Sequence, residues 1–110
     1  MGAAVNRGEI WNFRFDRPDK QRPVLILTRQ EMIRVLHTVS VAPLTRTIRG
    51  VPSEVVIGTE SGLKQPSAIN LHHIVTVPKS ELKRFVGTVS QETLQRVKEA
   101  LLFALGFDDE

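Results

Sequence analysis

The residues of this sequence best suited to hold a phosphate are an arginine and a threonine at the ends of two short apolar segments. Arg22 opens the segment 22–28 and directly precedes Pro23, whereas Thr45 closes the segment 41–45. The planar guanidinium of arginine matches two phosphate oxygens, and a hydroxyl can donate to another. Proline confines the preceding residue to extended backbone, which favours a fixed direction for Arg22. If the two segments are neighbouring strands, both side chains should reach one phosphodiester.

An excess of positive charge favours an anionic partner. The chain has 15 lysine and arginine residues against 12 aspartate and glutamate residues, a formal net charge of +3. Three of the acids are the last three residues, 108–110, so the rest of the chain is more basic than the total suggests. Arginine outnumbers lysine ten to five, and arginine is the better bidentate ligand for phosphate. Nucleic acid is therefore a partner class that the charge favours.

The length and composition indicate a single globular domain over residues 1–110. Hydrophobic residues make up 41% of the chain, and no apolar run approaches the roughly 18 residues that cross a membrane. The chain has no cysteine, which excludes disulfides and thiolate metal sites. The first eight residues have no basic start followed by an apolar stretch, so we expect no secretory signal and a cytoplasmic location.

Several short segments have the alternation or the apolar character of β-strands. In the segment 9–15, Trp11, Phe13 and Phe15 share one face, and we expect Trp11 and Phe13 to pack in the core rather than to stack on a base. Further strands are predicted over 23–27, 37–42, 54–58, 68–69 and 74–77, with turns at 16–21 and 61–62 and a basic loop at 46–50.

Two helices are predicted. The segment 28–36 has apolar residues at helical spacing, and Thr28 is a candidate N-cap. The second helix has Ser90 as its N-cap and Gly106 as its left-handed stop, after which Phe107 should fold back onto the helix. Val89 and Leu94 occupy the two staple positions around the cap. The apolar stripe of this helix is Leu94, Val97, Leu101 and Ala104 or Leu105.

The succession of at least five short strands and a terminal helix predicts a mainly β fold. The architecture expected is a small barrel or a strongly curved sheet, closed by the helix. Pro23 should be the first residue of its strand, because proline cannot donate to a ladder. For the same reason Pro43 should end regular pairing before Thr45.

Six motifs in one order resemble the MazF/PemK family of toxin endoribonucleases, over roughly residues 7–106. The most specific are Arg-Pro-Val-Leu-Ile-Leu at 22–27 and Val-Ala-Pro-Leu-Thr at 41–45. The others are Arg-Gly-Glu-Ile-Trp at 7–11, Gly-Leu at 62–63 followed by Ser67, Ile-Val-Thr-Val-Pro-Lys at 74–79, and Gly-Thr-Val-Ser at 87–90.

The resemblance implies an SH3-like barrel of about five to seven strands with a C-terminal helix, and a homodimer. It implies sequence-specific cleavage of single-stranded RNA without a metal or other cofactor, by attack of the 2′-hydroxyl, to give 2′,3′-cyclic phosphate and 5′-hydroxyl ends and inhibit translation. It also implies a MazE-like antitoxin whose disordered segment occupies the same groove. By position, Arg22 and Thr45 match the catalytic pair of the family. Small size independently favours the homodimer, because a short core gains stability by association.

Two departures from the family pattern affect the site. The loop at 16–21 is short and lacks the glutamate that many relatives place before the arginine, and the adjacent His72 and His73 replace acidic or amide residues. Histidine ordinarily exchanges a proton near neutral pH. His73 is therefore a candidate proton carrier if it alternates outward from Ile74, with a solvated loop histidine as the alternative. We expect no metal site, because adjacent side chains on a strand point apart.

Six further side chains are candidates for contacts with bound RNA, and each charged one could equally be a plain surface charge. They are Gln21, Arg46, Arg49, Lys64, Ser67 and His72.

Two other functions stay open at this point. A gyrase poison like CcdB shares the implied fold but acts through C-terminal residues that include a tryptophan, and the segment 106–110 has none. A non-catalytic RNA-binding barrel would bind RNA in a salt-dependent way without producing new ends.

Overall fold

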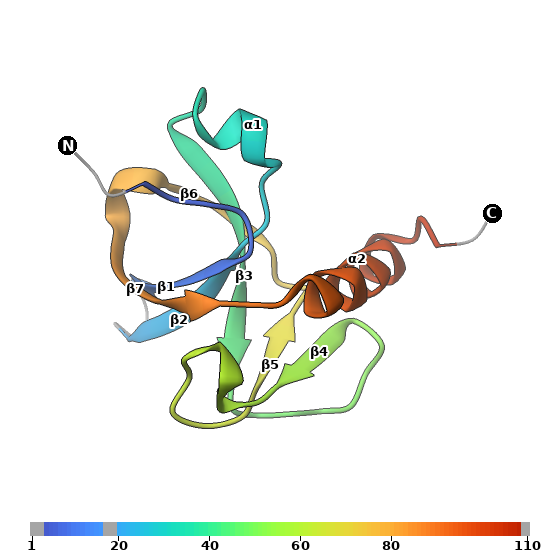
Figure 1. Cartoon of the computed structure of the whole chain (residues 1–110). Coiled ribbons are helices and arrows are strands. Elements are labelled where there is room, and N and C mark those ends of the chain that lie inside the picture. Colours follow the sequence, from blue (N-terminus) through green and yellow to red (C-terminus); the bar gives the residue numbers. More distant parts are fainter. Residues whose placement is uncertain (1–3, 17–19, 109–110) are drawn as a thin grey trace.

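A strongly curved antiparallel sheet and one long helix dominate the chain in a computed structural model, which describes residues 4–16 and 20–108 (Figure 1). The strands of the described part are β1 Glu9–Arg14, β2 Gln21–Ile26, β3 Thr38–Thr45, β4 Glu54–Ile57, β5 Ser67–Asn70, β6 Val75–Pro78 and β7 Leu82–Thr88. The helices are α1 Gln30–Ile33, α2 Gln91–Leu105 and the 3₁₀ turns η1 Thr59–Ser61 and η2 Lys79–Glu81.

The sheet follows the order β4-β5-β3-β2-β1-β7, and β6 also pairs with β3. Strand β3 is central because β2 takes one of its edges and two strands share the other. β6 pairs along Thr38–Val41, and β5 pairs at Leu44 and Thr45. Within the described residues β4 and β7 form no ladder, so the curved sheet stays open, and α2 packs beside β4 (Figure 1). The predicted fold class, a small curved β structure with a C-terminal helix, is confirmed.

The sheet carries a core on each of its faces, because the inner strands bury both sets of alternating side chains. Trp11 and Phe13 are buried on one face, as predicted, while Ile10 is buried on the other face beneath α2. The core beneath α2 includes Leu25, Leu44, Ile69, Leu71, Val97 and Ala100. The opposite core includes Val24, Ile26, Ile33, Val39, Val41 and Val77.

Helix α2 begins and ends where the sequence predicts. The Ser90 hydroxyl accepts the Thr93 N–H at 3.0 Å, and Gly106 adopts a left-handed φ of 79°. The Phe107 N–H donates to the Leu102 carbonyl at 2.8 Å, but the Phe107 side chain stays 72% exposed. The backbone therefore closes the helix, whereas the expected return of the Phe107 ring onto it is wrong.

The helix predicted over 28–36 is a single turn, α1. Its N-cap residue is Arg29, without a side-chain cap, and the Thr28 hydroxyl instead accepts the Ser40 N–H of β3 at 2.8 Å. Of the apolar residues in that segment, Ile33 is buried whereas Met32 and Leu36 are each 40% exposed. A helix needs a buried apolar stripe to extend beyond one turn, and here only one residue supplies it.

Both proline predictions need correction. Pro23 is the third residue of β2, opposite Asn12 of β1, and Pro43 lies inside β3, opposite Val24. The missing N–H of Pro43 is tolerated because β3 exchanges β6 for β5 at this point of its second edge. β3 therefore continues through Pro43 and carries Thr45 within the sheet.

Strand β7 has no counterpart in the sequence prediction. Its segment contains Lys83 and Arg84 and shows no clear alternation of buried and exposed residues. Gly87 lets this strand approach η1, since a Cβ there would lie 1.8 Å from the Ser61 carbonyl oxygen. The predicted turn over 16–21 includes residues 17–19, which lie outside the described residues; the Phe15 N–H before it donates to the Lys20 carbonyl at 3.0 Å.

Candidate functional site

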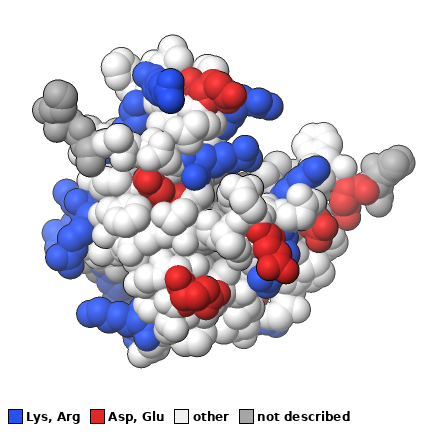
Figure 2. Space-filling model, viewed as in Figure 1, with Lys and Arg blue, Asp and Glu red and all other residues white. Residues whose placement is uncertain are grey.

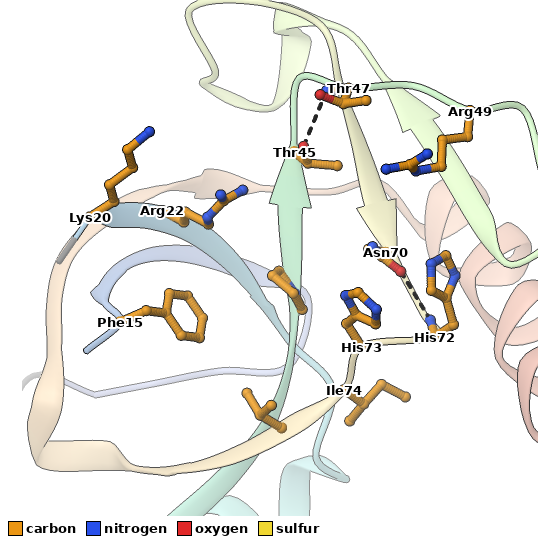
Figure 3. Close-up of a pocket in the computed structure, with 12 residues that line it drawn as sticks. Phe15, Lys20, Arg22, Thr45, Thr47, Arg49, Asn70, His72, His73 and Ile74 are labelled. Carbon is orange, nitrogen blue, oxygen red and sulfur yellow. Dashed lines mark hydrogen bonds between the residues drawn. The ribbon is translucent and has the colours of Figure 1, made fainter. Parts of the chain in front are cut away.

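Arg22 and Thr45 are brought together by the register of the two central strands. The ladder of β2 and β3 ends at the pair Val24 and Pro43, and Arg22 and Thr45 are the residues two positions beyond this pair. Side chains two residues apart on a strand share a face, so Arg22 and Thr45 lie on the face of Val24 and Pro43. Figure 3 shows the Arg22 side chain extending toward β3, near whose end Thr45 stands. The predicted convergence of the two residues is therefore present.

Two pockets meet at this pair of residues. A pocket of about 670 Å³ is lined by residues that include Phe15, Pro43, Arg49 and the two histidines, and a second, of about 780 Å³, lies toward β7. Lys20, Arg22, Thr45 and Thr47 line both pockets. Arg22 and Thr45 are partly exposed, so a ligand can reach each of them.

The Thr45 hydroxyl is oriented by a local hydrogen bond. Its oxygen accepts the backbone N–H of Thr47 at 3.1 Å (Figure 3). A hydroxyl has one proton to donate and two lone pairs, so this bond leaves the proton available. Thr45 can therefore donate a hydrogen bond to an oxygen held beside Arg22.

The linings of both pockets carry positive charge without an acidic side chain among the described residues. The basic residues are Lys20, Arg22, Arg46, Arg49, Lys64 and Arg84. Figure 2 shows basic side chains along the edge of the molecule where β2 and β7 lie in Figure 1. Low-dielectric walls lined by one sign of charge concentrate the opposite charge, so the pockets favour a polyanion.

The two histidines lie in the turn between β5 and β6, and both line the first pocket. The Asn70 side-chain oxygen accepts the backbone N–H of His72 at 3.2 Å. The rings of His72 and His73 pack edge to face, with their centroids 4.7 Å apart. His72 Nδ1 is 2.5 Å from the hydroxyl of buried Ser53. Adjacent side chains on a strand would point apart, but both histidines are exposed in a turn, as in the alternative of a loop histidine, and their rings lie side by side (Figure 3).

The other predicted contact residues divide between the pockets. Arg49 points into the first pocket, held by a loop in which the Arg49 and Gly50 N–H groups donate to the Glu54 carboxylate (Figure 3). Ser67 is only 7% exposed and donates to the Gln65 carbonyl, so it forms part of the wall rather than of the open rim. Gln21, Arg46, Lys64 and Ser67 line the second pocket.

Several residues of the site could not be predicted from the sequence, or only from their nearness to Arg22 and Thr45. Lys20 and Thr47 flank the predicted pair closely along the chain, so nearness alone was a usable signal. Nothing in the sequence indicates that Arg84 belongs to the site, because β7 was not predicted. Asn12 could be recognised only as a residue on the polar face of a strand. Within the described residues, no group of three histidine, cysteine or acidic side chains is placed to hold a metal ion.

The structure is thus a small curved β-sheet with two cationic pockets at the ends of its central strands, an arrangement suited to an anionic polymer. Over residues 6–105 the sequence matches the family described as PemK-like, MazF-like toxin of type II toxin–antitoxin system. The chain belongs to this family, as the motif order indicated.

Mycobacterial toxins are among its relatives. Endoribonuclease MazF3 of Mycobacterium tuberculosis is 39% identical over 90 residues, which cover 82% of this chain and 87% of the relative. The solved structure of Mycobacterium tuberculosis toxin MazF-mt6 has a TM-score of 0.84 at 36% identity, covering 92% of this chain and 99% of the other. An endoribonuclease from a mycobacterial species, solved in complex with its cognate antitoxin, has a TM-score of 0.86 at 28% identity, with 97% and 100% covered.

The helices offer no candidate for a membrane span. Among the described residues the longest helix, α2, has 15 residues, and none is long and apolar enough to cross a bilayer.

Proposed function

We propose that this chain is a toxin endoribonuclease that cleaves single-stranded RNA sequence-specifically, with Arg22 and Thr45 holding the scissile phosphodiester. One observation carries the proposal: Arg22 and Thr45, from the adjacent strands β2 and β3, both line the two cationic pockets at the place where these pockets meet. Relatives named endoribonucleases support RNA as the substrate. The match to the PemK-like, MazF-like family favours this activity over the CcdB-like alternative.

The reaction begins when the ribose 2′-oxygen attacks the adjacent phosphorus. A base takes the 2′-hydroxyl proton, the bond from the 2′-oxygen to phosphorus forms, and the bond from phosphorus to the 5′-oxygen breaks. An acid gives a proton to the departing 5′-oxygen, which leaves a 2′,3′-cyclic phosphate and a 5′-hydroxyl. The Arg22 guanidinium neutralises charge that develops on the phosphate oxygens. The Thr45 hydroxyl, oriented by Thr47, fixes the phosphate for in-line attack.

The proton carrier in this proposal is a histidine of the first pocket. No described lining residue is a carboxylate, and histidine is the side chain that ordinarily exchanges protons near neutral pH. His73 is the assigned carrier. His72, whose Nδ1 is held by Ser53, contacts the RNA beside it.

The partners proposed for the toxin are a MazE-like antitoxin and a second copy of the chain. An antitoxin segment that occupies the RNA groove would block Arg22 and Thr45 directly. The structural neighbour solved with its cognate antitoxin supports this kind of partner. The proposed site of action is the cytoplasm, where RNA and the antitoxin are made.

The test is cleavage of a long single-stranded RNA by the purified protein in EDTA, with cut sites mapped by primer extension. R22A should lower the single-turnover rate by at least about 10²–10³-fold, the usual cost of losing one transition-state ligand. R34A removes an exposed arginine outside both pockets and should cleave at the wild-type rate.

Unchanged cleavage by folded R22A would contradict the proposed mechanism. RNA binding by the wild type without any new 5′-hydroxyl ends would instead favour a non-catalytic RNA-binding protein.

A further inference from the structure

Asn12 is a half-buried amide in the wall of the second pocket. In the sheet it lies opposite Pro23 of β2 on one side and opposite Arg84 of β7 on the other. Opposed residues on neighbouring strands share a face. Asn12, Pro23 and Arg84 thus form a row on the face of the sheet opposite Trp11 and Phe13. Pro23 directly follows Arg22 along β2.

The Asn12 side chain makes no hydrogen bond to any other described residue. An asparagine offers two donors and an acceptor, and a partly desolvated amide gains from a partner for each of them. Other asparagines of the chain use theirs: Asn6 pairs with Glu9, and Asn70 accepts the His72 N–H. Asn12 is therefore free to bind a ligand with complementary donors and acceptors.

The rest of the pocket fits a nucleobase with its backbone. Apolar side chains form part of the wall and suit the flat faces of a base, and basic side chains suit the phosphates on either side. The apolar residues are Pro23, Leu44, Leu63, Phe85 and Val86. The basic residues outside the Arg22 site are Arg46, Lys64 and Arg84.

Because the second pocket shares Arg22 and Thr45 with the first, it would receive a base next to the phosphodiester that these two residues hold. Both residues line both pockets, so a phosphodiester held between them has one flanking nucleotide in each pocket. A half-buried amide can read the edge of an unpaired base through paired donor and acceptor contacts.

We propose that the second pocket is a nucleobase subsite in which the Asn12 amide selects the base next to the cleaved phosphodiester, while Arg84 and Lys64 bind the backbone. The inference rests on the proposed function for the position of the RNA. It makes Asn12 a specificity-determining residue of the toxin.

Selection from a random pool of 12-nucleotide RNAs tests the subsite without relying on cleavage. R22A and the double variant R22A/N12A are each allowed to bind the pool, and bound RNAs are sequenced. We expect a base preference at one position with R22A that the double variant loses. Equal preferences at every position would overturn the inference, even if neither protein can cleave.

Cleavage kinetics provide a second test of the Asn12 subsite. For an RNA containing a mapped cut site, N12A should reduce discrimination in kcat/KM at one flanking position by about 5- to 150-fold, the worth of one good base contact. N12D keeps the shape but loses the donors, so it should change which base is preferred. N6A, outside both pockets, should retain the wild-type cut sites.

Two outcomes separate this inference from the proposed function. Wild-type protein that cuts RNA, together with folded N12A and N12D variants that cut the same sites at the same relative rates, would remove only the Asn12 subsite. Wild-type protein that cuts no RNA, with a base preference in R22A that depends on Asn12, would remove the nuclease and keep the subsite. R84Q should raise KM alike for all sequences, because a phosphate contact carries no base information.

Discussion

Thr45 is suited to its proposed role because its hydroxyl oxygen accepts a hydrogen bond within the chain, while its hydroxyl proton stays free to donate to a ligand. A threonine at a strand end could instead spend the proton on a nearby carbonyl, as Ser67 does with Gln65. Here the Thr47 N–H occupies one lone pair of the Thr45 oxygen. The hydroxyl proton is therefore available to a phosphate oxygen held between Thr45 and Arg22, which line the same pockets. A fixed donor costs no reorganisation during the reaction, which is how preorganised groups lower a barrier.

The histidines can be tested by the pH dependence of cleavage. If His73 carries a proton, H73Q should lower the single-turnover rate by about 10²–10⁴-fold and flatten its dependence on pH. The charged and titratable groups that face it in the described pocket are Lys20, Arg22, Arg49 and His72.

The matched variants are H72Q, in the same pocket, and H37Q, an exposed histidine outside both pockets. H37Q should keep the wild-type profile. A flattened profile in H72Q alone would move the role to the histidine that Ser53 holds, and unchanged profiles in both pocket variants would contradict histidine catalysis.

The sequence predicts the pair Arg22 and Thr45 but not the arrangement of the histidines. The pair follows from two strands that meet in register, which apolar runs and motif order indicate. The histidine rings depend on a turn, held by Asn70, that replaces the expected start of β6. Asn12 could not be singled out, because an asparagine on a strand is informative only when its neighbours on both adjacent strands are known.

At the level of elements, β7 needs Gly87 because its backbone passes against η1. G87A should destabilise the fold by about 1–3 kcal/mol or more, since the added methyl would overlap the Ser61 carbonyl and force two backbones apart. Urea unfolding followed by circular dichroism measures the change.

G58A is the matched control. Its added methyl would meet only the end of the Glu60 side chain, which can move. Equal stability of G87A and wild type would contradict the close approach of β7 and η1.

Elements with local signals were predictable, and elements fixed by distant contacts were not. The boundaries of α2 follow from Ser90 and Gly106, whose cap and left-handed turn depend on neighbours in the chain. α1 starts at Arg29 rather than at Thr28, whose hydroxyl accepts the N–H of Ser40 in β3, twelve residues away, and it stays short because only Ile33 is buried. β7 has no clear alternation of buried and exposed residues, and it forms because β1 offers it an edge.

On the scale of the whole molecule, charge is distributed unevenly relative to the groove. Six basic residues line the two pockets without a described acid among them, although the formal net charge is only +3. In the view of Figure 2, acidic side chains lie at the top near α1, over the middle of the molecule and toward α2. Net charge therefore understates the attraction that the groove exerts on RNA.

This separation predicts how RNA binding responds to salt. Binding of a single strand releases counterions, so log Kd against log salt changes by about 0.7 for each phosphate contacted. With three or four phosphates in the groove, the slope for a 12-nucleotide RNA and the R22A protein should be about 2–3, measured by fluorescence anisotropy. R46Q should lower it by about 0.7, while K98Q, on the exposed side of α2, should leave it unchanged. Equal slopes for R46Q and K98Q would mean that RNA follows a different path across the molecule, and the cationic pockets would then lose their assignment as its track.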